Sequence, residues 1–86
     1  MQKIFSDIAW KDYLYWQEQD KKTLARINAL LLDVDRNGHK GIGNPERLKG
    51  ADGYWSRRIN GKDRLIYKIT DQQILIAQCR THYGEH

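Results

Sequence analysis

Four side chains in the second half of the sequence have the chemistry needed to cut a phosphodiester bond. Arg58 and Arg64 flank the turn in "RRINGKDR", and their planar guanidinium groups suit phosphate oxygens. Glu46 and His82 can take or give a proton, which accelerates a reaction about 10²–10⁴-fold when the group is well placed. Such a set predicts metal-independent RNA cleavage, in which a base activates the 2′-hydroxyl, cations stabilise the charge on phosphorus and an acid protonates the leaving 5′-oxygen.

The residues alone leave the division of roles open. Either Glu46 or His82 could be the base, and His82 could be the acid. Lys49 would join the arginines in an electrostatic clamp, and Tyr83 could stack on a nucleobase or donate its hydroxyl. On spacing alone, Glu46 is better explained as an exposed loop carboxylate.

Metal and cofactor chemistry is not expected. The histidines (His39, His82 and His86) lack the spacing of metal ligands, and the single Cys79 is too few for a zinc site. No glycine-rich phosphate loop precedes a predicted helix. We therefore expect neither a metal nor a cofactor.

The positive charge is confined to one half of the chain. Residues 1–38 carry six Lys/Arg and six Asp/Glu, whereas residues 39–86 carry nine and five and hold the whole net charge of +4. A localised basic excess suggests a polyanionic partner, most often nucleic acid, although a solvated basic face explains it equally well. No apolar run could span a membrane and no signal peptide is visible, so we expect a cytoplasmic protein.

Two helices are predicted in the first half of the chain. Ser6 is a suitable N-cap for a helix that runs to about Gln19. Asp20 can cap a second helix, which should stop near Gly38. The aromatic side chains of the first helix recur at helical spacing, which favours a place in the core or an interface over base stacking.

The remainder is predicted to be mostly strand. Residues 39–53 hold most of the glycines and the only proline, and we expect a long irregular loop there. An antiparallel meander follows, which predicts an α+β fold with two N-terminal helices packed on one face of a small antiparallel sheet, in a single domain of residues 1–86. The expected strands are Lys3–Phe5, Tyr54–Ile59, Arg64–Ile69 and Ile74–Tyr83.

The length of the central hairpin loop decides which cations share a face. A two-residue Asn60-Gly61 turn would mix charged and apolar side chains on both faces. A three- or five-residue loop instead puts Arg58 and Arg64 together on the face away from the core. We therefore predict the odd-length loop, with Arg57 as the one misfit on the apolar side, near the sheet edge.

The last strand is expected to add to the cationic face. Its predicted apolar series is Leu75, Ala77 and Cys79. Gln78, Arg80 and His82 would then point towards the cationic face, where Arg80 could contact phosphate. A β-bulge in this strand would exchange His82 for Tyr83.

Six stretches carry a resemblance that covers nearly the whole chain: "DYLYWQ", "INALL", "GNPERLKG", "GYWSRRI", "RLIYKITD" and "ILIAQCRTHY". In this order they resemble the YoeB toxins of the RelE superfamily of bacterial type II toxin–antitoxin systems. The resemblance implies a microbial-ribonuclease-like (RelE-like) sheet and an endonuclease that cuts mRNA in the A site of the 70S ribosome. It also implies inhibition by a YefM-like antitoxin, operator DNA bound only through the antitoxin complex, and a homodimer.

The resemblance further assigns roles to individual residues. It implies that the catalytic groups are Glu46, Arg64, His82 and Tyr83, and that Lys49 and Arg58 bind the substrate. The sequence departs from the family pattern in two places. The loop in "LKGADGYW" is one residue shorter, and "GEH" follows the tyrosine.

Two non-enzymatic functions also fit the charge. A module that binds RNA or the ribosome without cutting needs neither Glu46 nor His82, and a carboxylate would hinder phosphate binding. A structural partner in a DNA-binding complex should show a DNA-binding motif, and no helix-turn-helix or ribbon pattern is visible. Both observations favour the endonuclease.

Overall fold

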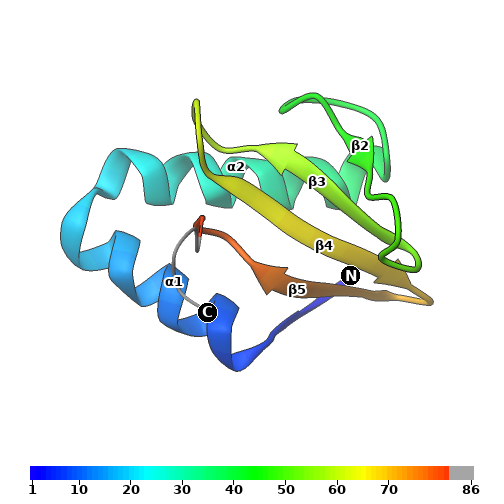
Figure 1. The fold of residues 1–86 in the computed structure, drawn as a ribbon, viewed down its shortest axis with the longest axis horizontal. Coiled ribbons are helices and arrows are strands. Elements are labelled where there is room, and N and C mark those ends of the chain that lie inside the picture. Colours follow the sequence, from blue (N-terminus) through cyan, green and yellow to red (C-terminus); the bar gives the residue numbers. More distant parts are fainter. Residues whose placement is uncertain (82–86) are drawn as a thin grey trace.

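The computed structural model describes residues 1–81, which form two helices and five strands (Figure 1). The elements are β1 (Gln2–Phe5), α1 (Asp7–Gln19), α2 (Lys21–Asn37), β2 (Glu46–Arg47), β3 (Tyr54–Arg58), β4 (Arg64–Thr70) and β5 (Gln73–Gln78). The order across the sheet is β1-β5-β4-β3-β2. The predicted α+β class is confirmed. The sheet is mixed, because β1 runs parallel to β5 while all other neighbours are antiparallel.

Both helices begin and end where the sequence predicts. The Ser6 hydroxyl caps α1 by accepting the N–H of Ala9 at 3.0 Å. Asp20 accepts from two backbone N–H groups in the first turn of α2, and Gly38 ends that helix with a φ of 62°. Asp20 is the only residue between the helices, so these caps also set the sharp corner between them.

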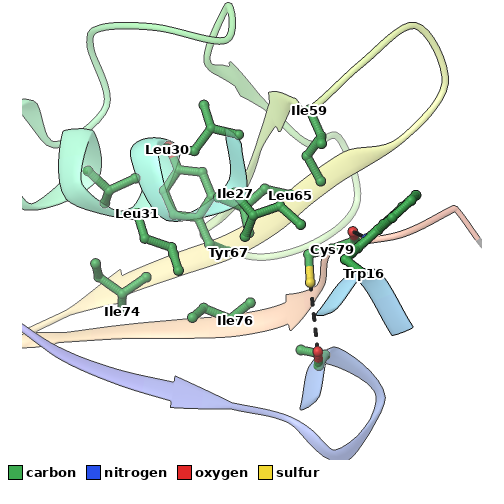
Figure 2. Packing of buried hydrophobic residues seen from close by; sticks show 12 residues of the cluster. Trp16, Ile27, Leu30, Leu31, Ile59, Leu65, Tyr67, Ile74, Ile76 and Cys79 are labelled. Carbon is green, nitrogen blue, oxygen red and sulfur yellow. Dashed lines mark hydrogen bonds between the residues drawn. The ribbon is translucent and has the colours of Figure 1, made fainter. Parts of the chain in front are cut away.

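The core lies between the two helices and one face of the sheet (Figure 2). Of the aromatic residues in α1, Trp16 is buried in it, whereas Trp10 is 49% exposed. The buried apolar side chains are Ala9, Trp16, Ile27, Leu30, Leu31, Val34, Ile59, Leu65, Tyr67, Ile74, Ile76 and Cys79. Within residues 1–81, no helix combines the length and apolar character that a membrane crossing requires.

The hairpin between β3 and β4 has the predicted odd-length loop. Arg58 pairs with Arg64, which leaves five residues, 59–63, in the loop. Trp55 pairs with Tyr67 on the core face, so the arginine pair lies on the opposite face. Segregation of apolar and charged side chains therefore outweighs the local preference for a two-residue turn.

The irregular loop predicted over residues 39–53 contains a short strand. Glu46 and Arg47 form β2, one of the two edge strands of the sheet, by pairing with Ser56 and Trp55 of β3. Two residues are too few to show the alternation by which a strand is recognised in a sequence. The prediction of an unstructured loop was therefore wrong at the position of Glu46.

Strand β5 is shorter than predicted and buries different side chains. Its buried residues are Ile74 and Ile76 in place of Leu75 and Ala77. A β-bulge explains the difference: Tyr67 pairs with Ile76 but Ile66 pairs with Gln78, so Ala77 has no partner and the alternation reverses. Cys79 is consequently buried, as predicted.

As predicted, Arg57 lies on the apolar side of β3, the strand next to the short edge strand β2, but its side chain is fully buried. Its Nε donates to the Tyr67 hydroxyl, and Nη1 donates to the Asp33 carboxylate. The remaining N–H groups donate to the backbone carbonyls of Gly38, Lys40 and Ile42. All five guanidinium donors are thus used, and Arg57 fixes the loop after α2 against the sheet.

The loop after α2 also gives the fold a pH-sensitive contact. The His39 ring is exposed but stacks on Trp55 with 4.0 Å between ring centroids, and partial desolvation followed by the charge of Arg57 lowers the pKa of His39. Because the unfolded chain then binds a proton more readily, stability should be lost as the pH falls below about 6.5. In the variant His39→Phe, the ring can still stack on Trp55 but cannot take up a proton. Between about pH 7.5 and pH 5.5, the urea midpoint of unfolding should therefore fall less for this variant than for the unmodified protein. The same fall in both proteins would contradict this assignment.

Candidate active site on the open face of the sheet

One face of the sheet carries no helix among the described residues, and we call it the open face. Directly paired side chains of antiparallel strands share a face with their Cβ atoms about 4.5–5.5 Å apart. The pairings place several rows of side chains on the open face. Three of them matter for the site: Glu46–Ser56–Ile66–Gln78, the Arg58–Arg64 pair on one side of it, and Tyr54–Lys68–Leu75 on the other.

The arginine row is held asymmetrically. Arg64 is half-buried, and its Nη1 donates to the carbonyl oxygens of Asn60 at 2.9 Å and Asp63 at 3.0 Å. Arg58 is exposed on the neighbouring strand. Like charges directly opposite one another weaken a hairpin, but an anion between the two forks would relieve this repulsion and accept hydrogen bonds from both.

Glu46 is the carboxylate of the open face. It pairs with Ser56, so Arg58, two residues further along β3, is its diagonal neighbour, at about 7–8 Å between Cα atoms in a regular sheet. The Asn44 amide donates to Glu46 Oε1 at 3.0 Å and orients the carboxylate. A proton acceptor thus lies near a pair of cations on one surface, and the backbone holds one member of this pair, Arg64.

Gly43 lets the chain reach this position. It adopts a φ of 81°, which favours glycine, and a Cβ there would lie only 2.8 Å from Leu30 Cδ2. Its carbonyl accepts the Arg58 N–H at 2.6 Å, three residues before Glu46. The close approach of this backbone to α2 and β3 therefore sets the path of the edge strand that carries Glu46.

Two predicted substrate-binding residues lie away from the arginine pair. Lys49 is exposed in the turn that follows β2, beyond the Tyr54 end of the open face. Arg80 follows the end of β5, so strand alternation no longer sets its direction. Its guanidinium carbon lies 3.7 Å from the centroid of the Tyr15 ring in α1, an arrangement that favours a cation–π interaction.

The predicted catalytic residues His82 and Tyr83 lie outside the described residues, but the segment before them is described. The Asp12 carboxylate accepts the Cys79 N–H at 3.0 Å, and the Trp16 indole donates to the Cys79 carbonyl at 2.8 Å. Asp63 Oδ1 then accepts the Thr81 N–H at 2.7 Å. Buried side chains, and not the sheet ladder, therefore hold residues 79–81.

Asn60 and Asp63 were not among the predicted site residues, although the carbonyls of both accept from Arg64 and the Asp63 carboxylate binds Thr81. Their signal was present, because an Asn and an Asp three residues apart are typical of a side-chain-capped turn. The Asn60-Gly61 dipeptide suggested a different turn. In the described part of the chain, no three His, Cys, Asp or Glu side chains are grouped so that they could hold a metal ion.

Solved structures with the same fold define the class of the protein. A heterotetrameric YoeB–YefM toxin–antitoxin complex from Staphylococcus aureus contains a chain that is 49% identical, with a TM-score of 0.92 and coverage of 96% of this chain and 98% of that chain. A structure of the YoeB dimer from the same organism is also 49% identical, with a TM-score of 0.91 and coverage of 96% and 98%. The fold is thus that of a RelE-like toxin.

The sequence comparisons identify the family within this class. Residues 5–83 match the family of YoeB-like toxins of bacterial type II toxin–antitoxin systems. The toxin YoeB of Streptomyces coelicolor is 50% identical over 84 residues, which are 96% of this chain and 100% of that protein. The chain belongs to the YoeB family, and the predicted resemblance is confirmed.

Proposed function

We propose that the protein is a ribosome-dependent mRNA endonuclease that cuts mRNA in the A site of the 70S ribosome and so inhibits translation in the cytoplasm. The observation that supports this most strongly is the juxtaposition of Glu46 with the Arg58–Arg64 pair on an uncovered sheet face. A surface that only bound phosphate would gain nothing from a carboxylate at this position, since the carboxylate repels the ligand.

In the proposed reaction, Glu46 accepts the proton of the 2′-hydroxyl, and the oxygen attacks the adjacent phosphorus. The bond to the 5′-oxygen breaks, and His82 donates a proton to that leaving group. Arg64 and Arg58 stabilise the additional negative charge on the phosphorane. A preorganised donor of this kind typically raises the reaction rate about 10²–10³-fold. Lys49 and Arg80 contact the RNA backbone on either side, and Tyr83 stacks on a nucleobase or donates its hydroxyl. The residues need no metal for these steps.

The proposed partners follow from the relatives. YoeB from S. aureus is found in a complex with YefM and as a dimer. We propose that a YefM-like antitoxin inhibits this toxin, that the toxin reaches operator DNA only through that complex, and that it can form a homodimer.

Incubation with mRNA-programmed ribosomes tests the activity. The expected products carry a 2′,3′-cyclic phosphate upstream and a 5′-hydroxyl downstream of a cut in the A-site codon. Intact mRNA on stalled ribosomes would overturn the proposal and indicate a non-catalytic ribosome-binding module.

Arg64→Ala is expected to lower the single-turnover rate of cleavage on programmed ribosomes by about 10²–10³-fold, because the preorganised cation is lost. Binding to ribosomes should change little. Lys62→Ala is the matched control, because Lys62 is an exposed cation in the adjacent 59–63 loop and is not one of the paired arginines. Equal loss in both variants would mean that only net charge matters and would contradict the role of Arg64.

A further inference from the structure

Asp63 is a buried carboxylate that the cleavage mechanism does not use. It is 1% exposed, and both of its oxygens accept hydrogen bonds: Oδ1 from the Thr81 N–H at 2.7 Å and Oδ2 from the Asn60 amide at 2.9 Å. Burying a carboxylate is costly. The buried position of Asp63 is explained by the two chain segments that its side chain connects. Asp63 and Thr81 are 18 residues apart in the sequence.

The first of these segments carries Arg64. Asn60 Oδ1 accepts the backbone N–H groups of Lys62 at 2.9 Å and Asp63 at 2.7 Å, which closes the 59–63 loop. The carbonyls of Asn60 and Asp63 in turn hold the Arg64 guanidinium. The Asn60–Asp63 contact therefore defines the loop geometry on which the position of the Arg64 side chain depends.

The second segment runs from Cys79 to Thr81 and leads directly into His82 and Tyr83 in the sequence. Strand β5 ends at Gln78, so the sheet ladder does not fix this segment. Asp12 and Trp16 hold the peptide groups on both sides of Cys79, and Asp63 holds the N–H of Thr81. The Asp63 bond is the described contact closest in sequence to His82.

We propose that Asp63 is a positioning residue for the cleavage reaction: with Asn60, it fixes the loop that holds Arg64 against the backbone segment that leads into His82 and Tyr83. This inference rests on the proposed function. Catalytic groups must be held within about 0.5 Å of their working geometry, and a misplacement of about 1 Å costs about 10²-fold in rate. Loss of the Asp63 bonds should therefore reduce turnover more than substrate binding.

An exchange of the two side chains tests the proposal. In Asp63→Asn alone, the new amide group either faces the NH₂ group of Asn60 or no longer offers an acceptor to the Thr81 N–H. The cleavage rate at saturating toxin is therefore expected to fall about 10²-fold. The toxin concentration at half-maximal rate should stay within about twofold. The double variant Asn60→Asp/Asp63→Asn restores a carboxylate–amide pair and an acceptor for Thr81, so its rate should recover to within about tenfold of the unmodified protein.

Asp71→Asn is the matched control, because Asp71 is exposed in the turn between β4 and β5 and loses the same charge. Its rate should not change. Unfolding curves for all variants establish that the rates compare folded proteins. If Asp63→Asn does not fold, the double variant Asn60→Asp/Asp63→Asn is the only test. A double variant that folds but cuts about 10²-fold more slowly than the unmodified protein overturns the proposal. An unchanged rate in folded Asp63→Asn also overturns it, whereas absence of cleavage by the unmodified protein would overturn the proposed function itself.

Discussion

Glu46→Gln is expected to lower the rate of mRNA cleavage on programmed ribosomes by about 10²–10⁴-fold, the usual contribution of a positioned proton acceptor. Glutamine has nearly the same shape, and its oxygen can still accept the hydrogen bond from the Asn44 amide. The substitution therefore removes basicity while the edge strand keeps its place. Affinity for the ribosome should be unchanged or higher, because one negative charge leaves a surface that faces phosphate.

Glu18→Gln is the matched control for this substitution. Glu18 is exposed on α1, and α1 is not on the open face. The control variant should cut at the rate of the unmodified protein. Single-turnover rates and ribosome-binding constants measured for both variants separate the effects. A Glu46→Gln protein that cuts at the normal rate would leave His82 as the base.

Arg57→Met is expected to lower the free energy of unfolding by about 3 kcal/mol, the low end of the cost of removing one partner of a buried ion pair, because Arg57 is fully buried but Asp33 is partly exposed. Methionine fills much of the volume but donates no hydrogen bond. The Asp33 carboxylate would lose its cation, and the carbonyls of Gly38, Lys40 and Ile42 would lose their donors. Urea unfolding monitored by tryptophan fluorescence measures the change.

Arg58→Met is the control for this prediction, because it makes the same substitution at the next residue of the same strand. Arg58 is exposed on the open face, so its removal should change the free energy of unfolding by less than about 0.5 kcal/mol. Similar losses of stability in both variants would show that the hydrogen bonds of Arg57 do not stabilise the fold. The two variants also contrast in function, since only Arg58 belongs to the proposed active site.

Features with a local cause were predictable from the sequence. The helix caps at Ser6 and Asp20 depend on side chains that bond to their own first turn. The pairing of Arg58 with Arg64 follows from alternation within two strands that are adjacent in sequence. The α+β class follows from the order of these elements.

Features that depend on contacts between distant segments were not predictable in this way. The partners of Arg57 come from α2, the loop after it and β4, so its burial could not be deduced from the pattern of β3 alone. The bulge at Ala77 exchanges the faces of β5 without any glycine to signal it. The prediction of a catalytic role for Glu46 came from family resemblance and not from spacing, because a two-residue edge strand has no periodicity.

The position of β5 has a consequence for the order in which the protein folds. This strand lies between β1 and β4, and its Ile74 and Ile76 complete the core. Until residues 73–81 join the sheet, β1 has no strand to pair with, and Asp12 and Asp63 lack the peptide groups that they bind. Because the entropy of closing long loops is paid before such non-local contacts form, the sheet that carries Glu46, Arg58 and Arg64 is completed only when β5 is in place.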